Sequence, residues 1–124
     1  MTATVVVADD DPDIRTLVSL SVVKAGLAIL ASVGDGALAL AAIREHRPDL
    51  AILDVSMPEM TGLEICRAVR LDASLDDLRI LLLSASVDEN TQAVGLAAGA
   101  DYFLAKPFSP RDLVVWLSVG KEAR

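Results

Sequence analysis

Short apolar runs alternate with longer stretches of helical spacing along the whole chain, and this alternation constrains the fold most. The apolar runs are rich in Val, Ile, Leu and Ala and cover residues 5–8, 27–33, 50–53, 80–83 and 102–105. Uniformly apolar runs of this length are typical of strands buried on both faces of a parallel sheet. The stretch after the first run spaces its apolar and small residues along one helical face, at Ile14, Leu17, Val18, Ser21, Val22 and Ala25.

The expected helices carry start and stop signals. Asp11 and Pro12 suit the N-cap and first position of a helix, and Gly26 suits its end. Further helices are expected at residues 36–46, 62–71, 89–98 and from Pro110 to about Gly120. Five strand–helix repeats predict an α/β fold of the (βα)5 doubly wound, flavodoxin-like kind. Its five-stranded parallel sheet has helices on both faces and the strand order 2-1-3-4-5.

Three acids are expected to meet where this strand order reverses. The first and third strands lie side by side there, and ligands bind outside the carboxyl ends of such strands. Asp9 and Asp10 follow the first strand, and Asp54 follows the third. Carboxylates at short range need a compensating cation, and oxygen ligands favour Mg²⁺, with Mn²⁺ as an alternative. The sequence therefore predicts a metal site of Asp9, Asp10 and Asp54.

Two further strand ends suggest phosphoryl transfer at this site. Ser84 ends the fourth strand and Lys106 follows the fifth, so a hydroxyl and an ammonium can both contact a phosphoryl group. Asp54 is then the candidate nucleophile. Taken singly, these residues could be ordinary turn or capping residues, and it is their conjunction at one sheet edge that favours the functional interpretation.

Composition narrows the class of protein. The net charge of −7 argues against direct nucleic-acid binding, which needs a basic face. The single cysteine, Cys66, allows neither an internal disulfide nor a thiol-based metal site, which suggests a reducing, cytoplasmic location. No apolar stretch reaches the length of a membrane span. We expect one domain over residues 1–124, with residues 120–124 as a candidate start of a linker.

Four segments together resemble the receiver domain of two-component response regulators, a CheY-like family, over essentially the whole chain. They are VVVADDDPDIR, PDLAILDVSMPEMTGLE, ILLLSAS and GADYFLAKPF. Arg15 fixes the register, because it lies six residues after the first acid of the family's pair. The resemblance implies that Asp9 and Asp10 are that pair and that Asp11 is the helix cap. It also implies a cis peptide bond between Lys106 and Pro107.

The resemblance implies the following roles in bacterial signalling. Asp54 accepts a phosphoryl group from the phosphohistidine of a histidine kinase or phosphotransfer protein. Asp10 and Asp54 bind Mg²⁺ directly, Asp9 acts through a bound water, and Ser56 supplies a backbone carbonyl. Ser84 and Lys106 contact the phosphoryl oxygens. The domain thereby catalyses its own aspartyl phosphorylation and dephosphorylation without being a conventional enzyme.

The resemblance also implies a switch. Ser84 moves toward the phosphoryl group, and Phe103, more often Tyr in the family, changes rotamer in response. The surface formed by residues 89–98, 102–105 and the last helix then changes shape and controls an output protein or domain. Finally, the resemblance implies that Ser56 and Ser86, which are both small, line the route of the water that hydrolyses the acyl phosphate.

Two local features lead to hypotheses. Gly95 lies inside an expected helix, so this helix could be marginally stable; the alternative is that Gly95 allows close packing on the sheet. Residues 113–117, LVVWL, are apolar on every side of a helix, so Trp116 and its neighbours could contact a partner or form a homodimer. The alternative is that this segment packs against the sheet.

Other classes fit less well. A haloacid-dehalogenase-type phosphatase needs a second acid where Ser56 stands, and the P-loop motif of nucleotide enzymes is absent. A flavodoxin-like electron carrier needs a hydroxyl- and glycine-rich loop after the first strand. The main alternative is a degenerate receiver that serves as a phosphorylation-independent docking or dimerisation module. The complete set of Asp9, Asp10, Asp54, Ser84 and Lys106 argues against it.

Overall fold

The computed structural model describes residues 2–86 and 88–122 of the chain. Its five strands are β1 (Thr4–Ala8), β2 (Ala28–Val33), β3 (Leu50–Asp54), β4 (Arg79–Ser84) and β5 (Tyr102–Ala105). Its helices are α1 (Pro12–Lys24), α2 (Gly36–His46), α3 (Gly62–Arg70), α4 (Glu89–Ala98) and α5 (Pro110–Glu122), with a short 3₁₀ helix, η1 (Ala73–Leu75).

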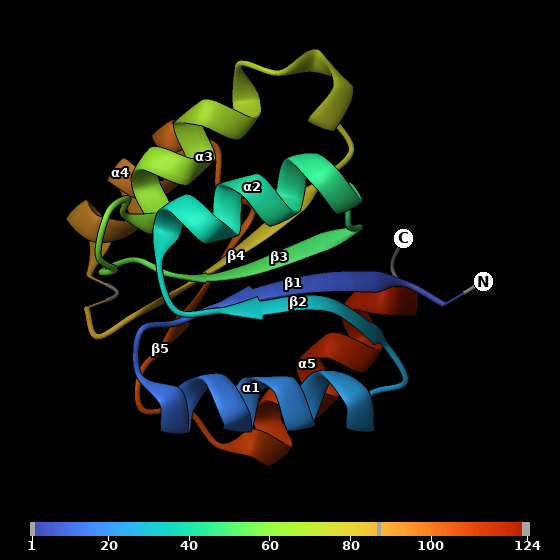
Figure 1. The fold of residues 1–124 in the computed structure, drawn as a ribbon. Helices are drawn as coiled ribbons and strands as arrows, with labels where there is room; N and C mark the ends of the chain where they lie inside the picture. The colour runs from blue at the N-terminus through green and yellow to red at the C-terminus, as the bar shows by residue number, and fades with distance from the viewer. Residues whose placement is uncertain (1, 87, 123–124) are drawn as a thin grey trace.

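The strands form one parallel sheet in the order β2-β1-β3-β4-β5, which confirms the predicted fold class. Helices α1 and α5 cover one face of the sheet, and α2, α3 and α4 cover the other (Figure 1). Every strand except the two at the edges therefore lies between helices and neighbouring strands. This arrangement explains why the strand sequences are uniformly apolar rather than alternating.

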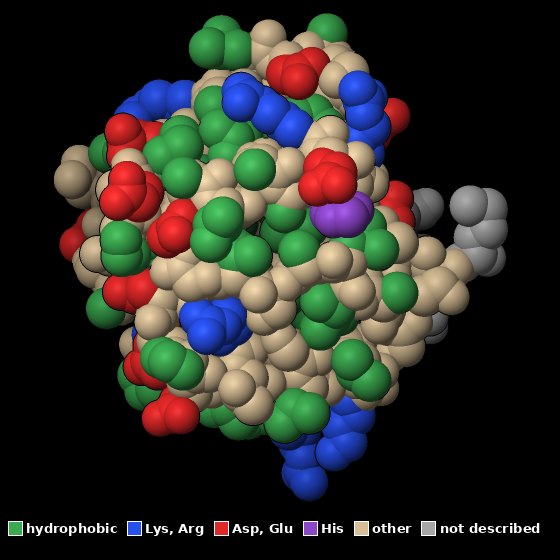
Figure 2. Space-filling view, viewed as in Figure 1, with side chains coloured by type: hydrophobic (Ala, Val, Ile, Leu, Met, Phe, Trp, Pro, Cys, Tyr) green, Lys and Arg blue, Asp and Glu red, His purple; other side chains and the backbone are tan. Residues whose placement is uncertain are grey.

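Each strand contributes side chains to two separate cores. In β1, Val6 and Ala8 pack toward α2, α3 and α4, whereas Val5 and Val7 pack toward α1 and α5. Successive side chains of a strand point to opposite faces, so a two-sided sheet needs apolar residues at every position. Acidic side chains gather along the left edge of the molecule in Figure 2, the edge at which the strands end in Figure 1.

The helix ends follow the capping residues. The Asp11 side chain accepts hydrogen bonds from the backbone N–H groups of Asp13 (2.9 Å) and Ile14 (3.4 Å), as predicted for the cap of α1. Helix α5 continues to Glu122, past the expected end near Gly120, so the proposed linker start overlaps this helix. Residues 123–124 lie outside the described part of the chain. No described helix is long and apolar enough to cross a membrane.

Gly95 of α4 was expected either to weaken this helix or to allow close packing on the sheet. Gly95 is buried, and a β-carbon at this position would overlap the ring of Phe103, so the glycine does allow close packing.

The apolar segment of α5 packs on the sheet through one side only. Leu113 and Leu117 are buried in the core between α5 and the sheet, while Val115 is 57% exposed. Trp116 packs edge-on against Tyr102, with ring centroids 5.0 Å apart. Contact of this face with a partner remains a prediction.

Candidate functional site

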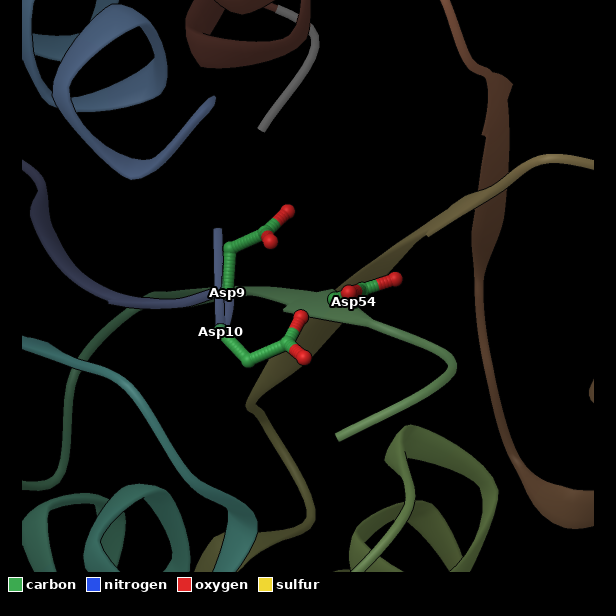
Figure 3. Close-up of side chains that lie close together, drawn as sticks. All are labelled: Asp9, Asp10 and Asp54. Atoms are coloured by element: carbon green, nitrogen blue, oxygen red, sulfur yellow. The ribbon is translucent and has the colours of Figure 1, made fainter. Parts of the chain in front are cut away.

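Three carboxylates converge at the carboxyl edge of the sheet. Asp9, Asp10 and Asp54 each offer an oxygen, and these oxygens lie within 4.8 Å of one another. Figure 3 shows the Asp9 and Asp10 side chains leaving the end of β1 on the side where Asp54 lies at the end of β3. Asp9 and Asp54 are buried, whereas Asp10 is exposed. The predicted acidic cluster is therefore present and open to solvent on one side.

Strand register places these acids together. Ala8 of β1 pairs with Leu53 of β3, so the next residues, Asp9 just after β1 and Asp54 at the end of β3, lie at the same level of the sheet. The Asp9 N–H donates to the Val33 carbonyl (3.2 Å), and the Asp9 side chain accepts from the Asp11 N–H (2.9 Å). These bonds turn the chain after β1, so the first two acids face the site while Asp11 caps α1.

Lys106 supplies the positive charge of the site. Its ammonium nitrogen lies 2.8 Å from Asp9 Oδ2 and 3.2 Å from Asp54 Oδ1. Asp9 Oδ2 is fully buried, and this ion pair is the contact that compensates its charge within the described residues. The peptide bond between Lys106 and Pro107 is cis, as the family resemblance implied.

Burial and charge set the protonation of the site. Burial, followed by repulsion from Asp9, raises the pKa of Asp54 to about 6, although Lys106 opposes this change. Burial lowers the pKa of Lys106, but its contacts with Asp9 and Asp54 outweigh that effect and leave the pKa above its usual value. At neutral pH, the site therefore holds an ionised Asp54 beside a protonated lysine.

A hollow of about 360 Å³ opens over these groups. It is lined by Asp10, Asp54, Val55, Ser56, Ser84, Ala85, Ser86 and Lys106. The Ser56 N–H donates to Asp54 Oδ1 at 3.4 Å, so the loop after β3 folds back over this carboxylate. The donors at the base of the hollow are carboxylate oxygens, the ligand type that hard divalent cations prefer. The residues present thus fit a magnesium-type ion.

The Ser84 hydroxyl is held by the loop after β4. It donates to the Ser86 carbonyl at 2.7 Å, and the Ser86 N–H donates back to the hydroxyl oxygen at 3.1 Å. The family resemblance placed Ser86 beside the route of the hydrolytic water, but this reciprocal pair of hydrogen bonds was not predicted. Phe103 does not line the hollow over Asp54. It lines a neighbouring one between α4 and β5, with Gln92, Leu96 and Tyr102.

Comparisons with known proteins agree with this geometry. The family model for the response regulator receiver domain matches residues 5–118. The DNA-binding response regulator MtrA of Mycolicibacterium smegmatis is 39% identical over 110 residues, which cover 89% of this chain and 46% of that protein. The transcriptional regulatory protein GltR of Pseudomonas aeruginosa is 41% identical over 110 residues, which cover 89% and 45%. The chain thus spans about half the length of these curated relatives.

Solved structures show the same fold. The receiver domain of the response regulator NarL from Mycobacterium tuberculosis superposes with a TM-score of 0.88 and 32% identity, covering 99% of this chain and 98% of that one. The chemotaxis response regulator CheY4 of Vibrio cholerae has a TM-score of 0.88 and 36% identity, covering 96% and 98%. With its acidic cluster, strand order and matching family model, the chain belongs to the response regulator receiver domain family of two-component systems.

Proposed function

We propose that residues 1–124 act as a single cytoplasmic phosphoacceptor domain that takes a phosphoryl group on Asp54 from a phosphohistidine. One observation carries this proposal. Asp54 borders a hollow that it shares with Asp10, Ser84 and Lys106, while Asp9 lies buried beside Lys106. A group bound to Asp54 in this hollow would meet a hydroxyl, an ammonium and acidic cation ligands together. The donor is a histidine kinase or a phosphotransfer protein.

The proposed step is a direct displacement. An Asp54 oxygen attacks the phosphorus, the P–O bond forms, and the P–N bond to the donor imidazole breaks. The imidazole leaves with the bonding electrons and takes up a proton. Asp54 must be ionised to attack, and its pKa of about 6 leaves it so at neutral pH.

Charge compensation at this step comes from the surrounding groups. Asp10 and Asp54 would hold Mg²⁺ or Mn²⁺ directly, Asp9 would act through a water, and Ser56 would offer its carbonyl. When bound, this ion would neutralise charge on the phosphoryl oxygens. Lys106 contacts Asp54 Oδ1 at 3.2 Å, and we expect its ammonium to transfer this contact to a phosphoryl oxygen.

The proposed output follows from the two switch residues. The Ser84 hydroxyl would leave the Ser86 carbonyl for the phosphoryl group, and Phe103 would respond to the space released. Because Phe103 packs on Gly95, a movement of its ring would also shift α4. The α4–β5–α5 surface would then favour an output protein or domain, or a second copy of the chain. Hydrolysis between the small residues Ser56 and Ser86 would reset the domain.

Phosphorylation by a small donor tests this function. The wild-type chain and an Asp54→Asn variant are incubated with acetyl phosphate and Mg²⁺, and intact masses are compared. We expect a phosphoryl adduct on the wild type that is absent from Asp54→Asn and lost when EDTA removes the metal. A wild type without an adduct, in a folded sample that binds Mg²⁺, would favour the degenerate docking module instead.

A further inference from the structure

Arg15 in the first turns of α1 lies beside the acidic pair without joining it in an ion pair. Its guanidinium Nη1 donates a hydrogen bond to the Asp9 backbone carbonyl at 2.8 Å. Within the described ranges, no carboxylate lies within ion-pairing distance of Arg15. We propose that Arg15 is a positioning residue for the cation site, which acts by fixing the peptide that joins Asp9 to Asp10.

Three hydrogen bonds hold Asp9 in place, and one of them, from Arg15, is made to the peptide that joins Asp9 to Asp10. The Asp9 N–H is tied to Val33 of β2, the Asp9 side chain is tied to the N–H of Asp11, and the Asp9 carbonyl is tied to Arg15. The peptide between Asp9 and Asp10 is planar, so fixing its carbonyl also fixes the N–H and the Cα direction of Asp10. Asp10 is exposed, and it lacks the enclosing side chains that hold Asp9 and Asp54. The direction in which the Asp10 carboxylate points therefore depends on the Asp10 backbone.

Gly34, in the turn between β2 and α2, leaves the space in which the guanidinium lies. A β-carbon at this position would stand 2.9 Å from Arg15 Nη1, closer than such atoms approach each other. The contacting atom is the end of a flexible side chain, so an added methyl group would displace the guanidinium rather than the backbone. Gly34→Ala thus moves the Arg15 head group away from Asp9 while keeping its charge.

If Arg15 acts through its charge, its removal changes Mg²⁺ affinity in one direction; if it acts through its hydrogen bond, the change is in the opposite direction. A guanidinium near a cation site repels the cation, so its charge alone weakens metal binding. Removing that charge should then strengthen Mg²⁺ binding. If Arg15 acts by holding the Asp9 carbonyl, removing it should weaken Mg²⁺ binding instead. Outer groups that orient metal ligands commonly change metal affinity by about 10–100-fold.

Calorimetric titration with Mg²⁺ alone tests this inference, which rests on the cation site of the proposed function. Wild-type binding tests the site itself, and the variants then test Arg15 separately. We expect Arg15→Gln and Arg15→Lys to weaken Mg²⁺ binding by about tenfold, because neither keeps the guanidinium bond to Asp9. Gly34→Ala should also weaken Mg²⁺ binding. Lys24→Gln, which removes an exposed charge at the far end of α1, should bind as the wild type does.

Thermal melting without metal accompanies each titration, because a purely structural role would lower the melting temperature and leave Mg²⁺ affinity unchanged. If Arg15→Gln fails to fold, Gly34→Ala still decides the question with the arginine in place. Tighter or unchanged Mg²⁺ binding in the folded Arg15 variants would overturn the inference, as would unchanged binding in Gly34→Ala.

Discussion

The ring of Phe103 in β5 occupies the place that a β-carbon would take at Gly95 of α4. Glycine inside a helix costs about 1 kcal/mol relative to alanine. Here this cost is accompanied by a close approach between α4 and the residue that we propose as the aromatic switch. The position of the ring and the position of the helix are therefore coupled through direct contact.

Gly95→Ala tests whether packing or helix propensity decides the role of this glycine. We expect the free energy of unfolding to fall by about 1–3 kcal/mol, because the added methyl group overpacks the ring. Urea unfolding of the variant, of Phe103→Ala and of the double variant measures the effect. The alanine at position 95 should be much less costly once the ring is gone. A more stable Gly95→Ala single variant would instead support the hypothesis that α4 is marginally stable.

Lys106→Met tests the counter-charge of the acidic cluster. The ammonium contacts both Asp9 and Asp54, and these buried carboxylates would repel each other without it. We expect the metal-free protein to lose roughly 1–3 kcal/mol of stability at neutral pH. Urea unfolding in EDTA and in saturating Mg²⁺ should show that the metal reduces the deficit. Lys24→Met, which changes an exposed lysine, serves as the matched control, and an equal loss there would refute the explanation.

The raised pKa of Asp54 predicts a specific pH dependence in the metal-free protein. The pKa is about 6 when folded, against an ordinary value of 3.8, so the folded chain binds this proton more tightly than the unfolded chain does. The protonated Asp54 therefore stabilises the folded state fully below pH 3.8, and this stabilisation is lost as the pH rises through about 6. Asp54→Asn has no such proton, so its stability relative to wild type should rise across this window, by roughly 1–3 kcal/mol at neutral pH.

Urea unfolding of wild type and Asp54→Asn at several pH values in EDTA measures this difference. Saturating Mg²⁺ is the control, since a bound cation favours the ionised carboxylate and should remove the advantage of the asparagine. A difference between the two proteins that stays constant with pH would contradict the assignment.

Arg70→Ala tests the hydrogen bonds that connect α3 to the segments preceding β4 and β5. The Arg70 side chain donates to the Gly99 carbonyl (2.9 Å), the Leu78 carbonyl (2.9 Å) and the Asp101 carboxylate (2.9 Å). Its loss would remove one donor from each of these partly buried acceptors, although Asp101 would keep the Ile80 N–H (2.8 Å) and its ion pair with Arg79 (3.6 Å). We expect a cost of about 2–4 kcal/mol. Thermal or urea unfolding measures it. Arg67→Ala, at an exposed position of the same helix, should cost far less.

The fold could be predicted because the signals that define it are local. Uniformly apolar runs mark strands buried on two faces, and Asp11 marks the start of α1 through a bond to its own neighbours. The meeting of Asp9 with Asp54 was also predictable, because strand order alone brings the ends of β1 and β3 together. The helix η1 was not predicted, since three residues are too few to show a period.

Most of the contacts that were missed join residues distant in sequence. Nothing near Arg70 indicates that its guanidinium reaches Gly99 and Asp101, and nothing near Gly95 indicates that a ring fills its missing side chain. The direction of the Ser84 hydroxyl depends on the conformation of the following loop. Such contacts follow from packing in three dimensions, which periodicity and spacing do not specify.

The pairing of Lys106 with two acids has a consequence for the overall charge of the site. Counted at their formal charges, three carboxylates and one ammonium leave two negative charges, which a single divalent ion cancels. In the proposed resting state with metal bound, the site is thus electrically neutral, and a phosphoryl group entering it would make it an anion again. The signal read by the rest of the domain would then be the return of a net negative charge to a centre whose net charge was zero.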